Sequence, residues 1–249
     1  MSDWRSNNYK MKTILIILMT AISCFSGQTN NHDSGLVASF HFGEGAGATT
    51  VGTVGNYVAT ITGGMAWTTG KIGWGLTGDG TGMASFPNNA NFMFGVSDFS
   101  LSTWVKITTD GELGIISKYD AAANNGYSLQ VYPSIYGIRI VMNRNGGSDY
   151  ILFDSLTTSV MPLKVWTHIA YTRKGSIHSM YINGTIHRTL VDAPVDCTTG
   201  NDGSLRLGSF SATYPRYITG SIDECSLWNR AITAGEVKQL YTNGKSKKE

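Results

Sequence analysis

The stretch at residues 220–232, GSIDECSLWNRAI, places a carboxylate where it could do chemistry. If this stretch is a β-strand, alternation puts Asp223 on the same face as Cys225 and Leu227. An ionised carboxylate that faces an apolar core is costly unless a partner compensates it. Asp223 is therefore expected either to lie at the solvated end of the strand or to hold a cation.

A second candidate is a patch of aromatic and planar polar side chains. In residues 126–133, Gln130 and Tyr132 lie opposite the apolar positions, and in residues 137–143 the same holds for Arg139 and Asn143. If these stretches form a hairpin, the four side chains face away from the core together. Saccharides are bound by aromatic faces and by planar polar groups that read hydroxyls, so the patch is a candidate sugar site. The alternative for each residue is an ordinary solvated sheet face.

Further side chains are expected to extend this binding surface. Trp74 is flanked by two glycines in a turn-rich stretch, which favours exposure, although packing over the edge of a sheet is the alternative. The residues expected to border the patch are Tyr150, Tyr214 and Arg216.

The motifs of several enzyme classes are missing. The chain has no serine nucleophile elbow, no phosphate loop and no reactive Cys-His pair. Its five histidines lack the spacing of zinc ligands. The 19 basic and 17 acidic residues are scattered except at the C-terminus, so no basic face for nucleic acid is expected. We expect no catalytic residue, no transition metal and no nucleic-acid partner.

The first residues have the pattern of an export signal. Met11 and Lys12 precede the apolar run ILIILM and the small residues AISCFSG, so residues 1–27 are expected to be a signal peptide or lipoprotein signal, with Met1 or Met11 as the start. Lipidation at Cys24 and ordinary cleavage are both open, and the apolar run is too short to span a bilayer comfortably. Residues 28–34 are expected to form a polar tether. Membrane attachment would then occur only through a lipid anchor.

Export permits a disulfide between the two remaining cysteines. Cys197 and Cys225 are expected either to be bridged or to be a loop thiol and a small buried residue, respectively.

The elements that must position these residues are β-strands. The chain has 249 residues, 30 Gly, 12 Tyr and 14% charged residues, with short apolar runs between turn signals, which is typical of one β-sandwich or barrel. Asn183 and Gly184 predict a tight hairpin. Thr233 and Glu236 form a capping-box pattern that predicts a short C-terminal helix ending at Asn243 and Gly244. Residues 245–249 are expected to be a basic tail.

Several segments, taken in order, resemble the laminin-G-like, concanavalin-A-like superfamily in its bacterial form. They include LVASFHFGEGAG, AWTTGKIGWGLTGDGTG, DFSLSTWVK, WTHIAYTR and GSIDECSLWNRAITAGEVKQLY. The resemblance covers about residues 35–242 and implies an all-β fold: a two-sheet antiparallel sandwich of jelly-roll type with a short C-terminal helix, over residues 35–244.

The resemblance also implies a metal and an activity class. Proteins of this fold commonly carry calcium on residues that match Asp223 and Asp79 here, which would compensate the charge of Asp223. Backbone amides from the N-terminal loop are the alternative partner for Asp223. Glycosidases of this fold carry paired carboxylates on one strand, and that pattern is missing. His168 and Tyr171 would face opposite sides of a strand, which disfavours the lyases of this fold.

We therefore expect a secreted, periplasmic or surface-attached non-catalytic carbohydrate-binding module with structural Ca²⁺, whose partner is an oligosaccharide or polysaccharide. The main alternative is a laminin-G-like adhesion domain that binds a surface or extracellular protein. A glycan-cleaving enzyme is the third hypothesis.

Overall fold

The computed structural model describes residues 33–120, 123–143, 161–198 and 203–246. One compact unit begins at Gly35, and residues Met1–Ser34 form a separate unit. The predicted signal region, its Cys24 and most of the predicted tether lie outside the described residues, as do residues 247–249 of the predicted tail; its first two residues, Lys245 and Ser246, belong to the C-terminal helix.

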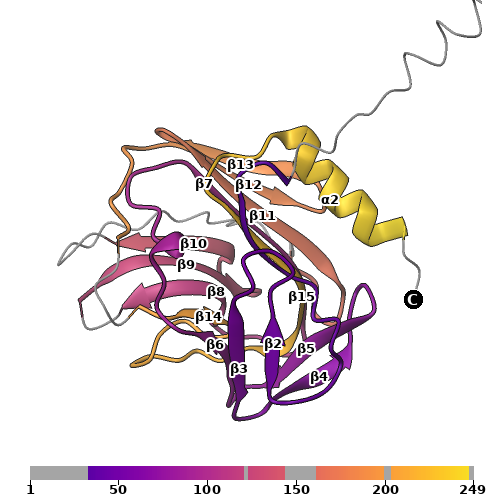
Figure 1. Cartoon of the computed structure of the whole chain (residues 1–249). Helices are drawn as coiled ribbons and strands as arrows, with labels where there is room; N and C mark the ends of the chain where they lie inside the picture. The colour runs from indigo at the N-terminus through magenta and orange to yellow at the C-terminus, as the bar shows by residue number, and fades with distance from the viewer. Residues whose placement is uncertain (1–32, 121–122, 144–160, 199–202, 247–249) are drawn as a thin grey trace, which may run out of the picture. The chain divides into compact units, whose positions relative to one another are not determined.

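The compact unit is built from two antiparallel sheets (Figure 1). The first, sheet A, has the order β13-β12-β11-β7-β15-β5-β4, with β1 paired to β15, and the second, sheet B, has the order β10-β9-β8-β14-β6-β3-β2. The strands of sheet A are β1 (Leu36–Phe40), β4 (Met65–Thr69), β5 (Trp74–Asp79), β7 (Phe99–Ile107), β11 (Thr167–Lys174), β12 (Ile177–Ile182), β13 (Thr185–Val191) and β15 (Thr219–Trp228). Those of sheet B are β2 (Thr49–Val51), β3 (Val58–Thr62), β6 (Met83–Phe86), β8 (Leu113–Asp120), β9 (Asn125–Tyr132), β10 (Gly137–Asn143) and β14 (Leu205–Leu207).

The core lies between the two sheets because alternate residues of each strand are apolar. On β9, Tyr127, Leu129 and Val131 are fully buried and belong to one large apolar cluster. The partner residues on β10, such as Ile138 and Ile140, belong to the same cluster. The predicted two-sheet sandwich is confirmed, and so is the hairpin at Asn183 and Gly184, which joins β12 to β13.

A β-bulge in β15 changes which residues share a face. Asp223 is paired with Trp104 and Ser226 with Ser102, so three residue steps on β15 match two on β7. Glu224 occupies the bulge with a φ of 52°. Asp223 therefore lies on the same face as Trp104, opposite the core.

The predicted alternation at this place is wrong. Cys225 and Leu227 belong to the core cluster, but Asp223 faces the other side of sheet A. The pattern of alternation holds only while the strand is regular, and the bulge adds one residue that inverts it.

The C-terminal helix α2 (Ala234–Ser246) begins as predicted and ends later (Figure 1). The Glu236 N–H donates to Thr233 Oγ1 at 3.2 Å, and the Thr233 N–H donates to Glu236 Oε2 at 2.6 Å, which confirms the capping box. The predicted end at Asn243 and Gly244 is wrong. A Cβ atom on Gly244 would lie 2.5 Å from Trp104 Nε1, so this glycine allows close packing of the helix on Trp104 rather than ending it.

Candidate functional site

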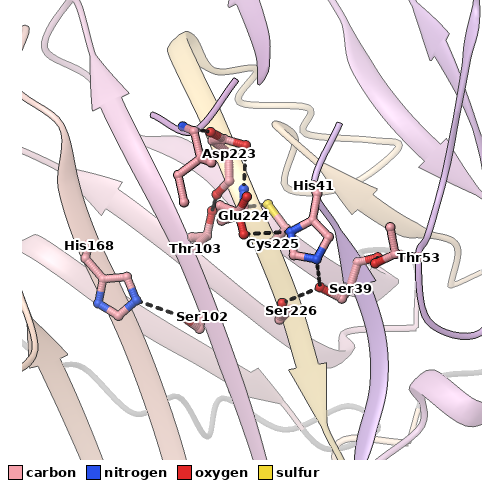
Figure 2. Close-up of polar contacts among 11 residues, drawn as sticks. Ser39, His41, Thr53, Ser102, Thr103, His168, Asp223, Glu224, Cys225 and Ser226 are labelled. Carbon is pink, nitrogen blue, oxygen red and sulfur yellow. Dashed lines mark hydrogen bonds and ion pairs between the residues drawn. The ribbon is translucent and has the colours of Figure 1, made fainter. Parts of the chain in front are cut away.

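The carboxylate of Asp223 is fully buried at the bulge and is held by backbone amides (Figure 2). The Ile72 N–H donates to Asp223 Oδ2 at 2.8 Å, and the Glu224 N–H donates to Oδ1 at 2.7 Å. Burial raises the pKa of this carboxyl to about 7, although the two amide donors oppose the rise. The expected alternative of amide donors is thus observed, but the donors come from the turn between β4 and β5 and from the bulge, not from the N-terminal loop.

Asp79 and Asp223 do not form the expected calcium pair. Asp79 is paired with Thr219, four residues before Asp223 on β15, which separates the two positions by roughly 13 Å at the rise of a strand. Oxygens that share one Ca²⁺ each lie about 2.3–2.6 Å from the ion. Asp79 instead accepts hydrogen bonds from the backbone and side chain of Thr81, at 2.9 and 2.7 Å. The prediction that Asp79 and Asp223 share one Ca²⁺ is therefore wrong.

The residues that the structure describes offer no other metal site of this kind. None of their His, Cys, Asp and Glu side chains gather in groups of three or more that could hold an ion. A calcium requirement stays a prediction without assigned ligands.

A chain of polar contacts crosses from β15 to β1 beside the bulge (Figure 2). His41 Nδ1 lies 2.6 Å from Glu224 Oε2, and His41 Nε2 lies 3.4 Å from Ser39 Oγ. The order carboxylate, imidazole, hydroxyl is that of a nucleophilic triad. However, Ser39 is only 3% exposed within its strand, and its hydroxyl is also bonded to Ser226 Oγ at 2.9 Å. We assign these contacts a structural role, in which they tie β1 to the bulged part of β15.

The predicted hairpin of β9 and β10 is present, but Gln130, one of the four residues of the predicted patch, is buried. Arg139 is paired with Gln130 on the outer face of sheet B, as the hairpin prediction required. Gln130 is 0% exposed, and its Oε1 accepts from Arg139 Nε at 2.8 Å and from Nη2 at 2.6 Å. The expectation that Gln130 contacts a ligand is wrong, because Arg139 covers it. Its role is to position the guanidinium.

Glu112 lies at the centre of this region, and no pattern in the sequence pointed to it. Its carboxylate forms ion pairs with Arg139 and, at 3.0 Å, with Arg216 Nη1. The Arg139 guanidinium also lies 5.0 Å from the Tyr136 ring centre, and Tyr136 meets Tyr132 edge to face at 5.6 Å. We call Glu112, Tyr132, Tyr136, Arg139 and Arg216 the tyrosine–arginine cluster.

Arg216 reaches this cluster because the loop before β15 folds onto sheet B. Phe210 in this loop stacks on Tyr119 of β8 at 4.6 Å, and the Arg216 guanidinium lies 4.8 Å from the Phe210 ring centre. The Gly114 N–H donates to the Arg216 carbonyl at 2.8 Å. Burial lowers the pKa of Arg216 from its ordinary value, but an arginine remains charged at neutral pH. Tyr214 belongs to the same loop and is 60% exposed.

Of the remaining predicted ligand residues, the structure places only Trp74, which lies away from the cluster. Trp74 is exposed as expected, at 48%, but it begins β5 of sheet A and packs against Gly45. The side chain of Asn143 and all of Tyr150 lie outside the described residues.

The predicted disulfide is not formed. Cys197 and Cys225 are both free and fully buried. Cys225 Sγ lies 3.1 Å from Thr103 Oγ1, whereas Cys197 Sγ donates to the Gly95 carbonyl at 3.2 Å. Burial raises the pKa of the Cys197 thiol to about 11. Cys225 is a small buried residue of β15 and Cys197 a thiol in a loop, as the alternative prediction stated, although the loop thiol is buried as well.

Two antiparallel sheets packed face to face, with loops that frame a polar cluster at one end, define a two-sheet jelly-roll domain. The family model described as the concanavalin A-like lectin/glucanases superfamily, of laminin G type, matches residues 78–238. The chain belongs to this superfamily.

Known proteins with sequence or structural similarity are of several kinds. Human adhesion G-protein coupled receptor D1 is 28% identical over 131 residues, which are 47% of this chain and 15% of the receptor. Domain 4 of AbnA, a GH43 extracellular arabinanase from Geobacillus stearothermophilus solved with arabinotriose, is 22% identical with a TM-score of 0.65, over 83% of this chain and 98% of that domain. The binding domain of botulinum neurotoxin DC solved with rat synaptotagmin II is 14% identical with a TM-score of 0.62, over 85% of this chain and 52% of that one.

At these identities the structural similarities establish the fold alone. Within the part of the chain that the structure describes, no helix has the length and apolar character needed to cross a membrane.

Proposed function

We propose that this protein is a non-catalytic saccharide-binding module that acts outside the cytoplasm. The observation that carries the proposal is the tyrosine–arginine cluster, in which aromatic rings and fixed hydrogen-bonding groups from three separate chain segments meet at one end of sheet B. Tyr214, exposed in the loop that brings Arg216 to the cluster, supplies an accessible aromatic face.

The cluster has the two kinds of group that saccharide recognition needs. Tyrosine rings offer apolar faces for the C–H patches of a pyranose or furanose ring, and their hydroxyls offer hydrogen bonds. The side chains of Arg216 and Glu112 are partly exposed, at 34% and 23%. They can donate to and accept from sugar hydroxyls. Because Gln130 and Glu112 hold the arginines in place, a ligand would meet a preorganised surface and little side-chain entropy would be lost on binding.

The similar structures support this class of ligand and one alternative. Domain 4 of the arabinanase was solved with arabinotriose, and the botulinum neurotoxin DC binding domain was solved with SialylT in one case and with synaptotagmin II in another. A saccharide is therefore our proposal, and a protein ligand for the same cluster is the second candidate. Extracellular action is proposed because the family to which this chain belongs includes many extracellular binding domains and residues 1–27 have the pattern of an export signal.

A glycan array with the full-length protein and two variants tests this function. Tyr214→Ala, in the loop of Arg216, should lose most of the glycan signal, whereas Trp74→Ala removes a similarly exposed aromatic side chain from sheet A and should keep it. Equal signals for Tyr214→Ala and the unchanged protein would contradict the assigned surface. No glycan signal for the unchanged protein would reject the saccharide proposal and favour the protein ligand.

A further inference from the structure

A hollow lies at the end of the sandwich where β1 and β7 begin and β15 ends. Its volume is about 470 Å³, within the range of pockets that hold small ligands. The residues that line it come from four segments far apart in the chain and include Val37, Tyr57, Asn91, Asp98 and Asn229. None of these residues belongs to the tyrosine–arginine cluster.

The wall of the hollow formed by residues 93–98 is held in place by a buried arginine. Arg173 is 0% exposed, and its guanidinium donates to the carbonyls of Ser97 at 2.9 Å, Gly95 at 2.6 Å and Val195 at 2.8 Å. It also lies 4.7 Å from the ring centre of Phe99. A buried charge is tolerated only when its hydrogen bonds are made, so this segment is fixed in one conformation. The hollow is therefore preformed.

The polar side chains of the hollow keep unused hydrogen-bonding capacity. Asn91 Nδ2 donates to the Tyr57 hydroxyl at 2.7 Å, which leaves the proton of that hydroxyl free to be donated to a ligand. Asp98 uses Oδ1 to accept from the Gly175 N–H at 2.7 Å, and its Oδ2 remains an acceptor. The side-chain amide of Asn229 has no hydrogen-bond partner among residues 33–120, 123–143, 161–198 and 203–246.

From this arrangement we infer a second ligand site, specific for a neutral saccharide. A carboxylate acceptor, an amide with both donor and acceptor and a phenolic donor match adjacent sugar hydroxyls, each of which donates and accepts. Val37, Met93 and Phe94 supply the apolar surface that the C–H face of a sugar needs. An anionic ligand is disfavoured because the charged group lining the hollow is the carboxylate of Asp98.

This site is independent of the proposed function because the two surfaces lie at opposite ends of β7. The hollow adjoins the start of the strand at Phe99, and the segment that carries Glu112 follows its end at Ile107. Eight residue steps of a strand span roughly 26 Å, so one sugar unit cannot contact both. The inference therefore adds a second binding event to the first.

Backbone amide NMR shifts and calorimetry test the second site. The probes are arabinotriose, xylotriose, cellotriose, mannotriose and maltotriose. We expect at least one to shift the amide signals of Asn91, Asp98 and Asn229. Its affinity for this site should fall at least about fivefold in Asn229→Ala and in Asp98→Ala, since each loses about one hydrogen bond.

Two controls separate a lost contact from a lost fold and from the other surface. Asn229 is exposed and its amide has no partner in the described part of the chain, so Asn229→Ala should keep the melting temperature. Arg216→Ala should leave binding at the hollow unchanged, even if it abolishes binding at the tyrosine–arginine cluster. The inference is overturned if no probe shifts the three signals, or if both hollow variants bind as the unchanged protein does.

Discussion

Replacing Asp223 by asparagine should stabilise the protein relative to the unchanged protein, and this difference in stability should increase as the pH rises. Burial raises the pKa of Asp223 from 3.8 to about 7. Between these values the folded protein holds a proton that the unfolded chain has released, so the stability of the unchanged protein falls as the pH rises through this window. A shift of about three units corresponds to roughly 4 kcal/mol as an upper limit. The asparagine side chain carries no charge and avoids this cost.

The measurement is urea unfolding of both proteins at about pH 4, 6 and 8, followed by tryptophan fluorescence. The difference in unfolding free energy, variant minus unchanged protein, should increase with pH by as much as about 4 kcal/mol. Other titrating groups are present in both proteins and cancel in this difference. Asp79→Asn changes an exposed carboxylate on neighbouring β5 and is the matched control.

The same experiment tests whether Asp223 holds calcium. A bound cation would lower the pKa of the carboxyl and reverse the sign of the expected change. In that case the variant would lose stability as the pH rises, and added Ca²⁺ would stabilise only the unchanged protein. Either that reversal or a difference that is constant from pH 4 to 8 would refute our account of this buried carboxylate.

Three other predictions concern buried groups. Burial lowers the pKa of His168 from 6.5 to about 3, so the protein should lose stability as the pH falls below about 6.5. In urea unfolding at pH 4 to 7, His168→Gln should reduce this loss. If the unfolding free energy of the variant depends on pH as that of the unchanged protein does, the prediction is contradicted. Gly244→Ala should destabilise the protein by about 1–3 kcal/mol because its Cβ would clash with the Trp104 indole. Gly235→Ala is the control, since a Cβ there meets only Thr233 Oγ1 at 3.8 Å. Equal melting temperatures for the two variants would disprove the packing role of Gly244. Reducing agent should leave the melting temperature and the mass unchanged, since Cys197 and Cys225 are free. A mass increase equal to two hydrogen atoms on reduction would show a bridge.

The sequence alone determined the regular parts of this protein. Alternation of apolar residues on β9 and β10 depends only on the two-residue period of a strand, so the core residues and the pairing of Arg139 with Gln130 could be predicted. The hairpin at Asn183 and the capping box at Thr233 are likewise local, because each is formed by residues a few positions apart.

Only the tertiary structure decided the features that involve distant residues or an irregular backbone. The bulge at Glu224 moved Asp223 to the other face of its strand, and register then separated it from Asp79. Glu112, which directly precedes β8, pairs with Arg139, and Arg216 reaches Glu112 because the loop before β15 folds onto sheet B. Alternation carries no information about a bulge or about which loop covers a sheet, since both depend on contacts between segments that are remote in the chain. The sequence therefore predicted Tyr132, Arg139 and the bordering Arg216 of the candidate site, but not Tyr136 or Glu112, whose carboxylate joins the two arginines.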